Sequence, residues 1–164
     1  MNYSTKNYHN LWRTKLLEVI ALQLLALPSA LSGAPTTAKF YAGASADDGV
    51  SFAVSFDVGS APQLLAEIQV ESGHINTVGN LYLVTQQDGQ FFLLIDDGSY
   101  IEWDGALETL AAAIPAKSLQ ASELLSVQGD VVLATMGDSS SVITTFLAYD
   151  TSAAPGEVYF SGAP

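Results

Sequence analysis

Carboxylates gather in one stretch of the chain, NLYLVTQQDGQFFLLIDDGSYIEWDG, which spans residues 80–105 and holds four Asp, one Glu and three Asp-Gly steps. Such acids could bind Ca²⁺, which takes several oxygen ligands from carboxylates and carbonyls on adaptable loops. They could also act as the acid pair of a small glycoside hydrolase, which needs two carboxyls at a set separation across a cleft. A third interpretation is structural, because Asp-Gly is favoured in the tight turns between strands.

The acid-dense turns supply the candidate calcium ligands. None of these turns has the spacing of an EF-hand loop. Adjacent acids such as Asp96 and Asp97 point to opposite faces of a strand, so they could share an ion only at a turn or bulge. Turn chemistry and solubility already predict acids at these places, so we favour the structural interpretation and keep calcium as the one possible cofactor. The candidate ligands are Asp47, Asp48, Asp96, Asp97, Glu102 and Asp104.

Aromatic residues beside the same acids raise the possibility of a carbohydrate-binding surface. Trp103 lies between Glu102 and Asp104, and Tyr100 and Tyr82 are close in sequence. Sugar rings stack on exposed aromatic faces, so this hypothesis requires Trp103 or Tyr100 to be exposed beside the carboxylates. The alternative is that Trp103 anchors the core, which is the usual role of a single large aromatic residue, and we favour it.

Nucleophilic catalysis has little support in the residues. The chain has no Cys, and His74 is the only His outside the first thirty-four residues. Its neighbours are polar, which predicts an exposed loop position. Gly137-Asp138-Ser139 resembles the nucleophile block of the GDS-type lipases, but no His follows Ser139. We therefore expect no catalytic residues and no enzyme activity.

Alternating apolar and polar residues predict strands over most of the chain. Asp88-Gly89 and Asp97-Gly98 should close two hairpins of a three-stranded meander. Leu107, Leu110, Ala111 and Ile114 share a helical face, which predicts one short helix near 105–114, with Asp104 as N-cap and Pro115 at its end. The expected fold is an all-β antiparallel sandwich, Ig-like or jelly-roll-like, of about nine or ten strands. The expected strands cover residues 50–56, 64–70, 81–86, 90–95, 99–103, 119–127, 131–136, 142–149 and 157–161.

The first thirty-four residues have the order of a secretory signal peptide. A basic start is followed by an apolar run over 16–27 and by small residues over 28–34. We place cleavage after Ser32, which leaves residues 33–164 as one β-sandwich domain; the alternatives for the segment are an uncleaved anchor and a soluble amphipathic helix. That segment carries two bases and sixteen acids, a formal charge of −14 (2 − 16). Such a charge disfavours nucleic acid as a partner. We expect a secreted or periplasmic/extracellular protein with no membrane span in its mature chain.

Two stretches resemble known modules. The segment 38–49, which reads AKFYAGASADDG, resembles the opening of β-rich modules in secreted proteins of aquatic Gram-negative bacteria. The segments FLAYD at 146–150 and PGEVYFSG at 155–162 resemble their closing hairpin. The resemblance implies a non-catalytic exported module, and it transfers no functional residue. The expected function is a binding or structural/adhesion-type module with a protein or glycan partner. The alternatives are a carbohydrate-binding protein, assisted by calcium in one version, and a small glycoside hydrolase.

Overall fold

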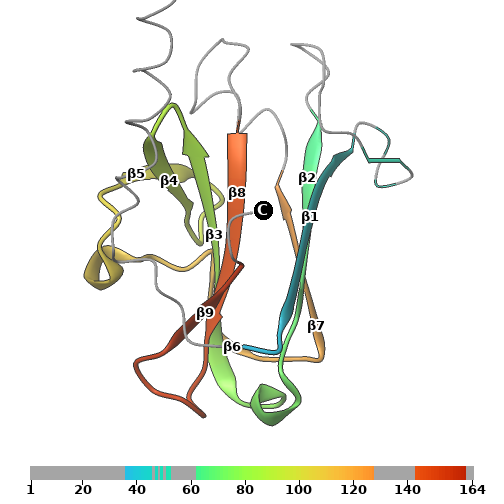
Figure 1. Cartoon of the computed structure of the whole chain (residues 1–164), viewed down its shortest axis with the longest axis vertical. Helices are drawn as coiled ribbons and strands as arrows, with labels where there is room; N and C mark the ends of the chain where they lie inside the picture. Colours follow the sequence, from blue (N-terminus) through green and yellow to red (C-terminus); the bar gives the residue numbers. More distant parts are fainter. Residues whose placement is uncertain are drawn as a thin grey trace, which may run out of the picture. The chain divides into compact units, whose positions relative to one another are not determined.

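The computed structural model describes residues 36–45, 47, 49, 51–52, 62–127 and 143–161 (Figure 1). The predicted signal peptide and the expected strand at 131–136 lie outside these residues, as does most of the expected strand at 50–56. The described elements are nine strands and two 3₁₀ helices: β1 Lys39–Ser45, β2 Gln63–Gln69, η1 Ser72–His74, β3 Val78–Gln87, β4 Gln90–Leu94, β5 Tyr100–Trp103, η2 Leu107–Thr109, β6 Ile114–Ser118, β7 Ser122–Val127, β8 Ile143–Asp150 and β9 Val158–Phe160.

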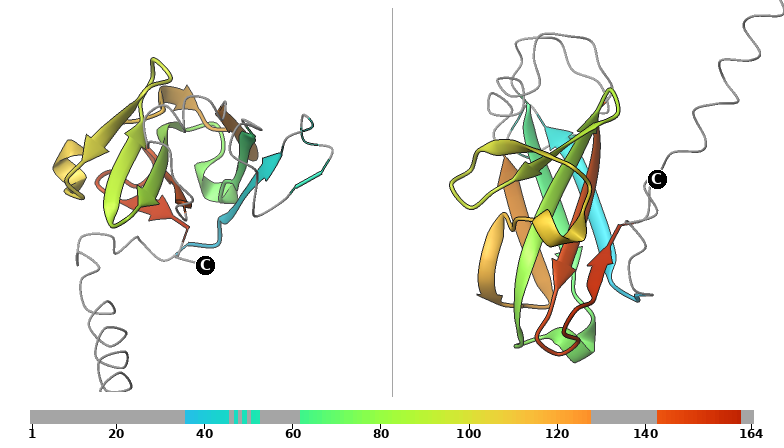
Figure 2. Two further views of the ribbon diagram at one scale, coloured as in Figure 1. Left: turned by 90° about the horizontal axis from the view of Figure 1, so that it is seen from above. Right: turned by 90° about the vertical axis from the view of Figure 1, so that its left-hand side faces the viewer.

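The strands form two antiparallel sheets that pack face to face (Figures 1 and 2). The three-stranded sheet has the order β1-β2-β7. The six-stranded sheet has the order β5-β4-β3-β8-β9, and β6 pairs with the beginning of β3. The core between them takes Ala66, Ile68 and Leu125 from the first sheet and Leu83 and Leu147 from the second. The predicted all-β sandwich is confirmed.

The predicted meander of β3, β4 and β5 is also confirmed. Asp88 and Gly89 both have positive φ, 50° and 82°, as a two-residue type I′ turn requires. The second hairpin differs in detail from the prediction. Only Gly98 has positive φ, and its amide donates to the carbonyl of Ile95 over 2.9 Å, so the loop takes three residues, Asp96, Asp97 and Gly98. A type I turn followed by a left-handed Gly is the second common hairpin solution.

The expected helix near 105–114 is wrong in extent. The segment holds a single 3₁₀ turn at η2, and Leu110 is already extended. Two other interactions override the helical pattern. Asp104 accepts from the amide of Ala106 over 3.0 Å and bends the chain locally. Ala113 and Ile114 then pair with Leu81 of β3, so Pro115 lies inside β6 and does not end a helix. β1 and β6 are strands that the sequence pattern did not predict.

An aromatic cluster closes one part of the core. Tyr149 and Tyr159 stack with ring centroids 5.2 Å apart, and Phe40 of the facing sheet lies 6.3 Å from Tyr149. His74 contacts both tyrosines, and its Nδ1 lies 2.9 Å from the Tyr149 hydroxyl oxygen. The expectation of an exposed His74 is therefore wrong. The 3₁₀ turn η1 directs the imidazole inward, where it joins the aromatic packing and finds a hydrogen-bond partner.

A second apolar layer lies on the opposite face of the six-stranded sheet. Strand parity places Val84, Leu93 and Phe91 on this face, because their neighbours in sequence face the core between the sheets. All three are buried. Trp103 packs edge-on against Phe91, with ring centroids 6.0 Å apart. This layer explains why the meander buries large side chains on both of its faces.

Candidate functional site

The three aromatic residues proposed for sugar stacking are buried. Trp103 is 5% exposed, and its indole N–H donates to the carbonyl of Ala106 and to the Thr109 hydroxyl, each over 3.0 Å. Tyr82 and Tyr100 are buried as well, and burial raises the pKa of both phenols. A ring without an open face cannot stack on a sugar. The carbohydrate hypothesis in its original form is therefore wrong for these three residues, and Trp103 is buried against Phe91 in the second apolar layer.

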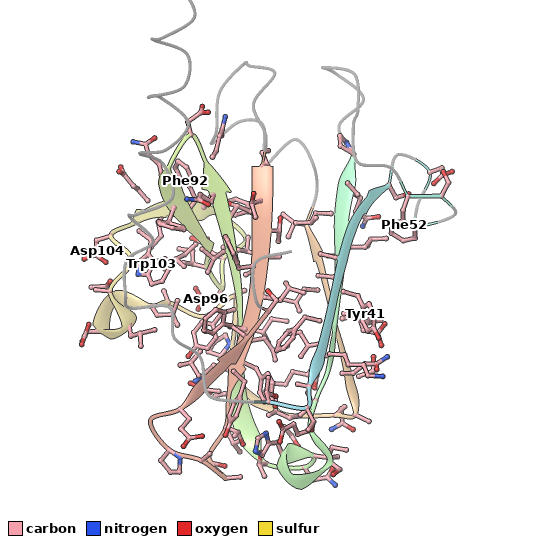
Figure 3. The ribbon with its side chains drawn as sticks, viewed as in Figure 1. Tyr41, Phe52, Phe92, Asp96, Trp103 and Asp104 are labelled. Carbon is pink, nitrogen blue, oxygen red and sulfur yellow. The ribbon has the colours of Figure 1, made fainter. Side chains whose placement is uncertain are left out.

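The acidic turns use their carboxylates within the turns themselves. Asp97 accepts from the amide of Ser99 over 2.8 Å, and Asp104 accepts from the hydroxyl of Thr109 over 2.5 Å. These hydrogen bonds to the charged form lower the pKa of both carboxyls. Asp96 and Glu102 are exposed on the same meander. Figure 3 shows Asp96 and Asp104 at separate places beside the sheet.

Asp47 has the same role at the end of β1. It accepts from the Ser51 hydroxyl over 2.6 Å, from the Ser51 amide over 2.8 Å and from the Ser45 hydroxyl over 2.7 Å. These bonds, with those from Ser51 first, lower its pKa to about 2. Asp48 lies outside the described residues. Within the part of the chain that the structure describes, no three His, Asp or Glu side chains converge as a metal site would require.

Asp150 is the most heavily engaged carboxylate of the described residues. It accepts from the amide of Asn80 over 2.8 Å, from the Asn80 side-chain nitrogen over 2.8 and 3.0 Å, and from the Tyr82 hydroxyl over 2.7 Å. Asn80 also accepts from the amide of Ala116, which has a φ of 50°. The cluster borders an open depression of about 580 Å³. Its hydrogen bonds tie β3 to β8 and β6, so Asp150 has a structural use for each of its oxygens.

The buried Glu123 is likewise paired. Its side chain points from β7 into the core, forms an ion pair with Lys117, and accepts from the amide of Gln120 over 2.6 Å. A buried carboxylate with a cation and an amide as partners has its charge compensated. Of the candidate calcium ligands, Asp47, Asp97 and Asp104 are thus held by their own turns, while Asp96 and Glu102 are exposed.

The outer face of the three-stranded sheet is the surface that combines exposed aromatic and polar groups. Tyr41 is 49% exposed, Phe52 59% and Leu124 71%. Figure 3 shows Tyr41 and Phe52 on the side of this sheet that faces away from β8. We call this surface the outer face and define it by strand parity. Its residues are Lys39, Tyr41, Gly43 and Ser45 of β1, Gln63, Leu65, Glu67 and Gln69 of β2, Ser122, Leu124 and Ser126 of β7, and Phe52 beside them.

Polar side chains on the outer face bond to one another along β2 and diagonally between β2 and β7. Glu67 lies between Tyr41 and Leu124 in register. It accepts from the Ser122 hydroxyl over 2.8 Å and from the Gln69 amide nitrogen over 3.2 Å. Further along the sheet, the Gln63 side-chain amide donates diagonally to the Ser126 hydroxyl over 2.6 Å. Donors and acceptors are thereby fixed in position next to exposed apolar groups.

Phe52 owes its position to Gly43. A side chain at residue 43 would bring a Cβ within 2.7 Å of the Phe52 ring, so the absent side chain leaves the space in which this ring lies. The turn at Gly49 also approaches Leu65, with its missing Cβ 3.0 Å from a Leu65 methyl group. The segment after β1 therefore covers part of β2 and presents Phe52 to solvent.

Comparison with protein-family models, with curated proteins and with solved structures gives no match to this chain. No helix in the described ranges is both long and apolar enough to cross a bilayer.

Sequence reasoning missed the outer face because its signal is weak. Tyr41 occurs in a run of small residues, and Leu124 is one of two adjacent Leu, of which only Leu125 is buried. Once the strand was known, parity could have indicated which of the two leucines points outward. The pairing of β1 with β2 and β7, which assembles the surface, is not visible in the sequence.

Proposed function

We propose that this protein is a secreted, non-catalytic binding module whose ligand surface is the outer face of the β1-β2-β7 sheet. The observation that carries the proposal is the exposure of Tyr41, Phe52 and Leu124 on one face. Exposed apolar groups that gather on one surface, with polar groups around them, are typical of interaction sites. Aromatic residues are also enriched among those that dominate binding energy.

The chemistry of this face supports binding more than catalysis. Its one described carboxylate is Glu67, which lies on a sheet surface and already accepts from Ser122 and Gln69. Hydrolysis by paired acids requires two carboxyls that face each other across a cleft. A single carboxylate in a row of amides and hydroxyls is better suited to orienting a ligand.

A protein partner is the more general possibility, but a glycan is the ligand class that can be tested first. Tyr41 and Phe52 offer ring faces, while Gln63, Glu67 and Gln69 offer the amide and carboxylate groups that bond sugar hydroxyls. The net charge of −12 opposes anionic polysaccharides. The expected glycan is therefore neutral. Calcium has no assigned role in this version, because the outer face carries only one described acid.

The test is binding of the full chain to a panel of soluble neutral polysaccharides, measured by affinity gel electrophoresis. Tyr41→Ala and Phe52→Ala should each weaken retention by at least about tenfold, because about 1.4 kcal/mol of contact energy corresponds to that factor. The matched control is Asp96→Ala, which changes an exposed residue of the meander and should leave retention unchanged.

Two outcomes would count against this assignment. Retention that is lost in Asp96→Ala but kept in Tyr41→Ala would move the ligand surface to the meander. An absence of retention on every neutral glycan would exclude the glycan version. The outer face would then be tested for a protein ligand by photo-crosslinking from a probe at residue 124 in an extract of the native cells. The same crosslinking in the Tyr41→Ala variant would be the comparison.

A further inference from the structure

The edges of the two sheets differ in how they are protected from pairing with other strands. Exposed edges are usually guarded by short length, proline, charges or inward-pointing charged residues. β5 and β9 are only four and three residues long. β6 contains Pro115, and β7 directs the charged Glu123 into the core. Each of these four strands therefore carries a recognisable guard.

β1 is the edge strand with the weakest guard. It has seven residues, KFYAGAS, and all seven pair with β2 in an unbroken antiparallel register. It contains no proline and no acid, and Lys39 at its first position is its one charge. Among the residues that the structure describes, no strand pairs with its second edge. β1 thus offers a flat row of backbone donors and acceptors.

We propose that β1 pairs antiparallel with β1 of a second copy, so that two three-stranded sheets join into one six-stranded sheet. Full overlap of two identical seven-residue strands places Ala42 opposite Ala42 of the second copy, on the twofold axis. Tyr41 then lies opposite Gly43 of the second copy, on the outer face. The Phe52 ring already lies over Gly43, so this pairing would bring the Tyr41 ring of one copy against the Phe52 ring of the other, and aromatic pairs across strands are stabilising.

The charges at the ends of β1 favour the antiparallel direction. Lys39 begins the strand, and the carboxylate of Asp47 follows its last residue and is tied to Ser45. Antiparallel pairing brings Lys39 near Ser45 and Asp47 of the second copy. Parallel pairing would instead place the two lysines together and the two acids together. The charges at the two ends therefore agree with the antiparallel orientation and oppose the parallel one.

Net charge sets the conditions under which the pair forms. Each copy carries a formal charge of −12, and this repulsion acts against association at low salt. The two Lys39 contacts are exposed ion pairs and contribute little by comparison. Salt screens the larger repulsive effect, so association should strengthen between about 20 mM and about 500 mM NaCl. An interface held mainly by the two lysines would show the opposite trend.

Pairing would extend the outer face across both copies and so enlarge the proposed ligand surface. The pairing itself does not depend on the proposed function. Leu124 lies on the outer face at the far edge of the same sheet. Leu124→Lys should therefore weaken ligand retention without affecting the pair. Ala42→Lys should break the pair, because it places two lysines on the twofold axis. The two proposals can thus fail separately.

The absence of Cys from the chain permits a direct test of the register. We would produce the full chain as Ala42→Cys and as Leu124→Cys, and follow disulfide formation under mild oxidation at 500 mM NaCl. Residues directly opposite in an antiparallel pair have Cβ atoms about 5 Å apart, which is within reach of a disulfide after small shifts. Ala42→Cys should form a covalent dimer at least tenfold faster than Leu124→Cys. Equal rates would indicate random collision and overturn the proposal.

Sedimentation equilibrium of the cysteine-free chain provides the second measurement. The unsubstituted protein should show a monomer–dimer equilibrium, and Ala42→Lys should raise its dissociation constant at least tenfold. Leu124→Lys should leave that constant unchanged. A protein that stays monomeric at every salt and protein concentration, or a dimer that survives Ala42→Lys, would overturn the assignment to β1.

Discussion

The same residue types have opposite environments in the meander of β3, β4 and β5 and on the outer face of the β1-β2-β7 sheet. In the meander, Trp103 and Tyr100 are buried, and exposed acids such as Asp97 cap turns. On the outer face, Tyr41 and Phe52 are exposed, and amide, hydroxyl and carboxylate groups lie beside them. Aromatic and acidic residues occur in both regions, so composition does not distinguish a packed region from an interaction surface.

The difference follows from what lies over each sheet. Segments after β5 cover the meander, where the indole N–H of Trp103 bonds to Ala106 and Thr109. Among the described residues, the outer face is covered in part by the turn at Gly49 and by Phe52. A residue that points away from the central core is buried when a second apolar layer forms on that side and exposed when it does not. Strand parity therefore determines the face of the sheet on which a side chain lies, and the segment that covers that face determines whether the side chain is exposed.

The largest expected effect tests this contrast between the two aromatic sets. Trp103→Ala should lower the free energy of unfolding by about 3–5 kcal/mol, because it removes a buried aromatic ring and leaves a cavity. Tyr41→Ala should change it by no more than about 0.5 kcal/mol, as is usual at exposed positions. Urea unfolding of the full chain measures both. Comparable losses in the two variants would show that Tyr41 is part of a packed layer and would remove the outer face as a candidate surface.

An intermediate effect tests the contrast between the acids. Asp150→Ala should destabilise the protein by about 2–3 kcal/mol, because Asn80 and the buried Tyr82 lose a charged hydrogen-bond acceptor. Asp96→Ala, at an exposed turn, should stay within about 0.5 kcal/mol of the unsubstituted protein. Denaturant midpoints at neutral pH compare the two. A neutral Asp150→Ala would free that carboxylate for a functional role beside its depression.

The smallest effect concerns pH and the turn acids. Asp47 has a folded pKa of about 2, below its ordinary 3.8, because Ser51 and Ser45 donate to its charged form. Its contribution to stability is therefore present above about pH 3.8 and is lost as the pH falls towards 2. The pKa values of Asp97 and Asp104 are also lowered, as is that of Glu71, which accepts from the Thr36 hydroxyl and the Thr37 amide, so these acids add to the same acid-side loss.

Urea midpoints between pH 5 and pH 2 measure this loss, with Asp47→Asn as the matched variant. The neutral amide keeps an acceptor for the Ser51 amide but does not titrate, so its midpoint should fall less over this range. An identical decline in Asp47→Asn and in the unsubstituted protein would show that the Asp47 bonds contribute nothing measurable to stability.

Part of the architecture could be predicted because it depends on local patterns. Alternation over β2, β3 and β4 and the Asp-Gly steps gave the meander and the sandwich class, since strand period and positive-φ turns are local properties. The helix near 105–114 failed for a non-local reason, because Ile114 pairs with Leu81 of β3. β1 was missed because its small residues, such as Ala42 and Gly43, carry a weak pattern.

The candidate site shows the same division. Residue types and spacing were enough to indicate turn acids and a buried Trp103, because Asp in a tight turn and a Trp in a β-rich segment behave similarly in most settings. They could not indicate that His74 turns inward or that Tyr41, Phe52 and Leu124 share one surface. Those properties depend on which strands become neighbours and on which face a second layer covers, and both are set by contacts between segments far apart in the chain.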